Sequence, residues 1–222
     1  MARKEYFTVR LNRIRIQDNR EWGAAEIKIL SFVTAGNDSL PALEGYRDTN
    51  SDAEKKELIK TAARDLISFR EFVEVDNVRD DSVLTFGSAD AGISVYTANK
   101  IPLDINWALV LIERDTDVRE IGTELETLLG DPGFDDFTSN LVTVIGGTVA
   151  PQVTIAFKLG KFLAGQAGKI FKKNKDDQVG LFGTSLNRFQ HYVNGERKKD
   201  EVRGVNGNVF VDYTLFGTEY EG

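Results

Sequence analysis

The sequence predicts a mainly β protein, an antiparallel β-sandwich of about eight strands with helical insertions. Short segments alternate apolar and polar residues, as strands with one buried face do. Asn-Gly pairs, which are strong turn signals, stand at 194–195 and at 206–207. The 222 residues suit one such domain, and no internal repeat or linker divides them. We therefore expect a single domain over 1–222, with a helical insertion at 116–183.

The first predicted strand covers residues 5–17. Its apolar positions change phase at Asn12-Arg13, and one extra residue at that point would reverse the facing pattern. This predicts a β-bulge. A second strand over 23–34 follows a short turn and completes an antiparallel hairpin.

The segment 105–113 is apolar on both faces, with Asn106 and Glu113 as its polar residues, which predicts a central strand covered on both faces. Alternation predicts further strands over 71–78, 82–87, 92–97, 185–193 and 208–217. The charged segment 194–207 between the last two is expected to be a loop.

A helix is predicted over 52–69, because Ser51 and Glu54 form a capping box before an apolar stripe of helical spacing. Inside the insertion, helices are expected between Asp115 and Gly130, over 135–144 and over 151–173. Acidic residues in the first turn and a proline at the start are typical of helix N-termini.

Composition excludes several classes of function. The chain has 28 Lys and Arg against 35 Asp and Glu, a net charge of -7, which disfavours nucleic acid as the partner. It has no cysteine, so disulfides, thiolate metal sites and cysteine nucleophiles are excluded. No apolar leader and no run of about 18 apolar residues occurs, so we expect no signal peptide and no transmembrane segment. The expected location is the cytoplasm, or outside the cell by a leaderless route.

Catalytic motifs are missing from the sequence. His191 is the one histidine, and neither a nucleophile elbow nor a phosphate-binding glycine loop accompanies it. His191 is expected to be an ordinary strand residue. We therefore expect no enzyme, although a hydrolase that uses two carboxylates stays open as a third hypothesis.

The predicted helix at 151–173 carries a basic face. On a helical projection five lysines share one side: Lys158, Lys161, Lys169, Lys172 and Lys173. Such a face could contact anionic lipid or an acidic partner protein. The alternative is an ordinary packed helix whose lysines are solvated.

A second candidate site is acidic. Asp115 and Asp117 follow the central strand, and Asp18 follows the first strand. If both strands point the same way, the three carboxylates could converge on calcium, which takes about six to eight oxygen ligands. The alternative is that Asp115 or Asp117 caps the helix that follows.

With its first strand ending in an acidic loop and its central strand ending in Asp115-Thr116-Asp117, the chain resembles the C-two domain of synaptotagmin and protein kinase C. The resemblance implies an eight-stranded sandwich that binds calcium through Asp18, Asp115 and Asp117 and bridges it to anionic lipid. Two further positions that are Asp in that family are Ala24 and Thr123 here.

The first hypothesis is thus a non-enzymatic binding module that contacts a membrane surface or a partner protein, with calcium as a candidate ligand. The second is a structural or assembly protein, such as a homo-oligomeric jelly-roll component of a phage or secretion apparatus. Exposed sheet edges, which must be covered or paired, are the basis of the second hypothesis.

Overall fold

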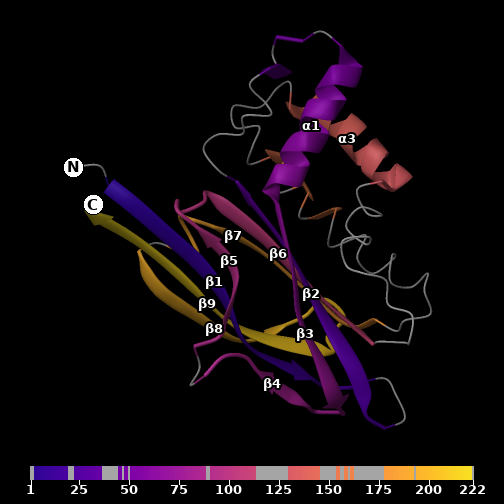
Figure 1. The fold of residues 1–222 in the computed structure, drawn as a ribbon, viewed down its shortest axis with the longest axis vertical. Coiled ribbons are helices and arrows are strands. Elements are labelled where there is room, and N and C mark those ends of the chain that lie inside the picture. The colour runs from indigo at the N-terminus through magenta and orange to yellow at the C-terminus, as the bar shows by residue number, and fades with distance from the viewer. Residues whose placement is uncertain are drawn as a thin grey trace.

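The computed structural model describes residues 3–19, 23–36, 45–46, 48–49, 51–88, 91–113, 130–145, 154–155, 158–159, 161–162, 178–192 and 194–221. Within them two antiparallel sheets pack face to face, and helices lie against one of the sheets (Figure 1). The predicted β-sandwich with helical insertions is confirmed.

Sheet A has the strand order β4-β1-β9-β8, and β5 pairs with β1 on the same side as β4. β5 pairs with the middle of β1, Phe7–Leu11, and β4 pairs with Arg13–Arg15 near its end. The strands are β1 (Arg3–Ile16), β4 (Val83–Thr85), β5 (Ile93–Ala98), β8 (Gly195–Arg203) and β9 (Val209–Glu221).

Sheet B has the order β3-β2-β6-β7, so β2 and β6 are its central strands. Their register pairs Gly36 with Asp104 at one end and Ile27 with Glu113 at the other. The strands are β2 (Ala25–Gly36), β3 (Ile67–Val78), β6 (Asp104–Glu113) and β7 (Gln178–Asn187).

The main core lies between the two sheets. On β1, Leu11 and Ile14 both point into it, because the register of β1 and β9 shifts between Leu11 and Arg13. This confirms the predicted bulge. Trp107 of β6 meets the rings of Phe182 and Tyr213 edge-on, with centroids 5.2 and 5.4 Å away, which joins β6, β7 and β9.

A second core covers the outer face of sheet B. Two helices, α1 (Asp52–Leu66) and α3 (Pro132–Ile145), lie side by side there, joined by helical residues within 154–162. Val110 of β6 is buried against this layer, while its neighbour Leu109 is buried in the main core. The prediction that 105–113 is covered on both faces is therefore confirmed. The predicted helix over 52–69 is three residues shorter in the structure, because α1 ends at Leu66 and β3 begins at Ile67.

Two predictions at the C-terminal end are wrong. The expected loop 194–207 contains β8, an edge strand whose one partner in the described residues is β9, so its charged side chains stay in water and need not alternate. The expected strand 185–193 is instead β7 at Gln178–Asn187, followed by a turn. Residues 178–183 of the predicted helical insertion thus belong to sheet B. Gly180 weakens the strand pattern there, but a Cβ at this position would lie 2.2 Å from Val209.

Candidate binding face on sheet A

The two sheets differ in what covers their outer faces. α1 and α3 bury the outer face of sheet B, but no helix among the described residues packs against the outer face of sheet A. The open face receives every second side chain of β1 and β9. On β1 these include four cations: Lys4, Arg10, Arg13 and Arg15.

Two bulges meet at one level of this face. β1 shifts register between Leu11 and Arg13, and β8 shifts between Lys199 and Val202; both shifts flank Asp212 of the strand between them. A bulge adds twist and re-aims the side chains beside it. The paired bulges therefore turn polar side chains of three strands toward one another.

Asp212 holds the two bulges together. Its Oδ2 accepts a hydrogen bond from Nε of Arg13 at 2.6 Å, and its Oδ1 accepts from the backbone N–H of Glu201 at 2.6 Å. The residue is 8% exposed, so its carboxylate is largely shielded, and both bonds are partly buried. Glu201 has φ of 51°, a left-handed conformation that the bulge imposes and that the bond to Asp212 helps to hold.

Glu201 in turn fixes a second arginine. Nη2 of Arg15 donates to its Oε2 at 2.6 Å, and Nη2 of Arg13 donates to its Oε1 at 3.3 Å. The guanidinium of Arg15 also lies 4.0 Å from the ring centre of Phe210, in cation–π contact. The hydrogen bond from Arg15 lowers the pKa of Glu201. These groups are solvent-exposed, so the pairs orient the arginines more than they stabilise the fold.

Asn12 links the bulge of β1 to its other neighbours. Its side-chain oxygen accepts from the hydroxyl of Thr214 at 2.9 Å. Its backbone carbonyl accepts from the N–H of Phe86, just after β4, at 2.9 Å. The bulge therefore also positions the end of β4 beside β1.

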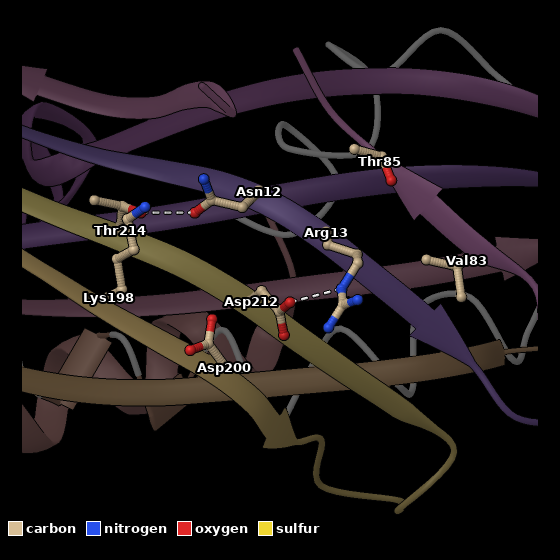
Figure 2. A pocket seen from close by; sticks show the side chains of 8 residues that line it. All are labelled: Asn12, Arg13, Val83, Thr85, Lys198, Asp200, Asp212 and Thr214. Carbon is tan, nitrogen blue, oxygen red and sulfur yellow. Dashed lines mark hydrogen bonds and ion pairs between the residues drawn. The ribbon is translucent and has the colours of Figure 1, made fainter. Parts of the chain in front are cut away.

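These residues border a groove of about 350 Å³, shown in Figure 2. β1 and β9 form its floor, β4 one wall and β8 the other. Cations, carboxylates and neutral hydrogen-bonding groups all line it: Asn12, Arg13, Val83, Thr85, Lys198, Asp200, Asp212 and Thr214. Because Asp212 is already bonded to Arg13 and to a backbone amide, the two acidic residues here are not an arrangement poised for proton transfer. The groove instead offers oriented charges to a ligand.

The predicted acidic site is only partly described. Asp18 directly follows β1, and the side-chain amide of Asn208 bonds both its N–H and its carbonyl, at 3.0 and 2.6 Å. Asp115 and Asp117 lie outside the described residues. The pairing of Ile27 with Glu113 brings the end of β6 to the same end of the sandwich as the β1–β2 connection. Within the described residues, no group of three acidic or histidine side chains is arranged as a metal site. Calcium binding stays a prediction.

The predicted lysine face is also described in part. Lys158 is half-buried and Lys161 is exposed, while Lys169, Lys172 and Lys173 lie outside the described residues. Leu159 is fully buried in the second core, so this helical segment packs its apolar side on the outer layer of sheet B. No described helix is long and apolar enough to cross a membrane.

His191 has a structural role that its sequence context did not indicate. It lies in the turn after β7, not in a strand, and its Nδ1 accepts the backbone N–H of Asn187 at 3.0 Å. The ring therefore closes the turn. Four residues of this face were not predicted as site residues either: Arg13, Arg15, Glu201 and Asp212. Glu201 stood in an expected loop, so its pairing with the arginines of the first strand could not be seen in the sequence.

Comparison with known proteins adds no relative. A scan of the chain against models of protein families finds no match. A search of well-characterised proteins also finds none that matches.

Proposed function

We propose that this protein is a non-enzymatic binding module that docks an acidic partner protein on the open face of sheet A. The observation that carries the proposal is the contrast between the two outer faces. One is sealed by helices, and the other presents oriented charges and half-buried aromatic rings around a groove. Mixed polar and aromatic surfaces with fixed arginines are typical of protein interfaces.

The cations of β1 are the basis for proposing an acidic partner. The chain as a whole is acidic, yet β1, RKEYFTVRLNRIRI, carries five Arg or Lys and a single Glu. Four of these cations alternate onto the open face in the middle of sheet A. Arg13 and Arg15 are held by carboxylates, which fixes their guanidinium groups before a ligand arrives. Fixed charges reduce the side-chain entropy lost on binding.

The experiment is site-specific photocrosslinking in cells that express the protein. A benzophenone amino acid replaces Val83 on the groove wall, or Val144 on α3 as the matched control; the two are 49% and 37% exposed. We expect one discrete adduct from position 83 that does not form from position 144. Equal adduct patterns from both positions would refute the proposal.

Calcium dependence is a separate part of the proposal and rests on a different observation. Asp18 lies beside the turn at Asp80 and Asp81, since the N–H of Asn19 donates to Asp80 at 3.0 Å and Asp81 bonds the carbonyl of Gln17. The end of β6, which leads to Asp115 and Asp117, reaches the same end of the sandwich. A cation there would join the loops of both sheets.

Thermal unfolding with calcium and with a chelator tests this part. Calcium at about 100 times its dissociation constant should add roughly 2.7 kcal/mol, a rise of several degrees in Tm. The rise should disappear in Asp115→Asn/Asp117→Asn and shrink in Asp18→Asn. An unchanged Tm would refute calcium binding and would not affect the proposal for the docking face.

The assembly hypothesis has less support. The edge of β8 is charged and bulged, which opposes pairing with a second sheet. The free edge of β7 is partly closed by the β8–β9 turn, where the N–H of Val205 bonds the carbonyl of Leu181 at 2.7 Å. Sedimentation velocity over a wide concentration range would reveal a homo-oligomer and would then favour assembly.

A further inference from the structure

The first residue of β6 is a buried carboxylic acid with an unmet hydrogen bond. Asp104 is 9% exposed, and its Oδ2 accepts from the side-chain amide of Asn106 at 3.3 Å. Its Oδ1 has no partner, and among the described residues it is the one buried side-chain oxygen or nitrogen in this state. An ionised carboxylate is costly to bury in such a place, whereas a neutral acid is tolerated.

The groups around Asp104 do not compensate a charge. β2 presents Gly36 and β7 presents Asn187 as its register partners. The phenol of Tyr192 is close enough for Asp104 to raise its pKa, after burial as the larger cause; Tyr96 adds to the same effect and Arg188 opposes it. The guanidinium of Arg188 is bound to Glu5 and Glu219, at 3.4 and 2.8 Å. Burial consequently raises the pKa of Asp104 to about 6, and the bond from Asn106 opposes the rise only in part.

Asp104 lies where the turn 188–191 is attached to the sandwich. The N–H of Arg188 donates to the carbonyl of Leu103 at 2.9 Å, and the N–H of Leu103 donates to Gly36 at 3.1 Å. The hydroxyl of Tyr192, just after the turn, donates to the carbonyl of Pro102 at 3.1 Å. Pro102 and Leu103, the two residues before Asp104, therefore hold both ends of the turn.

The turn itself presents an aromatic ring to solvent. Asn187 closes it by accepting the N–H of Gln190 at 2.9 Å, and His191 closes it from the other side. Phe189 at its tip is 83% exposed, the largest value among the described large hydrophobic residues. Whatever loosens the attachment of the turn changes how this ring is presented.

We infer that Asp104 is a proton-controlled lock on the turn 188–191. With Asp104 neutral, the attachment through Leu103, Pro102 and Asn187 is closed and Phe189 is held in place. Ionisation puts an unpaired charge beside these bonds, and the turn opens so that water reaches the carboxylate. The lock does not depend on the docking face of sheet A.

The sign of the effect is fixed by the direction of the shift. The open state has a hydrated carboxyl that titrates near 3.8, and the closed state titrates near 6. Between these values the closed state binds the extra proton, so closure weakens as pH rises and then stays constant above 6. A shift of this size corresponds to roughly a hundredfold change in the opening equilibrium.

Hydrogen exchange of the amides of residues 187–192 in the full chain tests the lock. We compare wild type with Asp104→Asn, a neutral isostere, and with Asp136→Asn on the exposed side of α3 as control, at about pH 4 and about pH 8. The ratio of protection factors, Asp104→Asn over wild type, should rise more than about tenfold between the two pH values. For Asp136→Asn it should stay constant.

A ratio for Asp104→Asn that does not change with pH would overturn the lock. If Asp104→Asn does not fold, the pH dependence of protection in the wild type tests the lock by itself. Loss of protection as pH rises from about 4 to about 6, confined to residues 187–192, supports the lock; protection that is unchanged, or that is lost as pH falls, contradicts it.

Discussion

β6 of sheet B and β1 of sheet A both bury one face in the shared core, but their other faces meet different surroundings. The second face of β6 carries Ala108, Val110 and Ile112, all buried under the helices. The second face of β1 carries arginines that pair with β8 and β9. Sheet B thus separates two hydrophobic cores, whereas sheet A separates the main core from solvent. We expect substitutions to affect stability behind sheet B and binding in front of sheet A.

The largest effect should come from the helix layer. Phe134 of α3 is fully buried; its ring stacks with that of Phe137, with centres 5.8 Å apart, and lies tilted to that of Phe162, 5.7 Å away. Phe134→Ala should lower the free energy of unfolding by about 3–5 kcal/mol. Phe216→Ala on the half-buried outer face of sheet A is the matched control and should cost clearly less. Denaturant unfolding measures both, and equal losses would remove the distinction between the two faces.

The next effect is a gain in stability that depends on pH. Because burial raises the pKa of Asp104 from 3.8 to about 6, its ionisation opposes folding at neutral pH. Asp104→Asn should therefore add up to about 3 kcal/mol at pH 8, less whatever opening of the turn already relieves, and the gain should fade as pH approaches 3.8. Urea unfolding over this range measures it; a loss of stability at pH 8 would show that the ionised form is needed.

Asp212 should matter more for stability than its position on an open face suggests. Asp212→Ala leaves the backbone N–H of Glu201 and the Nε of Arg13 without their acceptor, and buried unmet groups cost about 1–3 kcal/mol. Denaturant unfolding checks the loss. A change close to zero would mean that water replaces the carboxylate and that the bulges do not need it.

The smallest effect should come from the exposed pair of Arg15 and Glu201. Glu201→Gln should change the free energy of unfolding by less than about 1 kcal/mol, because both side chains are solvated. Its effect on partner affinity should be larger than its effect on stability, since the arginines lose their fixed orientation. A double-mutant cycle with Arg15→Ala separates the pair energy from single-residue effects.

Much of the core architecture could be predicted, because burial leaves a periodic trace in sequence. The doubly apolar β6, the phase change at Asn12 and the capping box of α1 each predicted the observed element. β8 leaves no such trace, since an exposed edge strand is specified by its hydrogen bonds to β9 and not by burial. Gly180 weakens the strand pattern of β7, because the close approach of Val209 leaves no room for a side chain there.

The candidate binding face could not be predicted from the sequence either. The arginines of β1 could be assigned to a strand, but their acceptors lie far along the chain. Arg13 meets Asp212 across 199 positions, and Arg15 meets Glu201 across 186. The pairing of β1 with β9, and of β9 with β8, brings these side chains together. Asp104 escaped prediction because its unmet oxygen is a property of packing.

The most direct test of the docking face is a titration of the partner captured through position 83. Its dissociation constant is measured for wild type, for Lys198→Glu in the groove and for Lys100→Glu, an exposed control after β5, at about 50 and 300 mM salt. We predict that Lys198→Glu weakens binding by about tenfold or more at low salt and less at high salt, and that Lys100→Glu binds like wild type. Equal affinities of all three proteins at both salt concentrations would contradict the account.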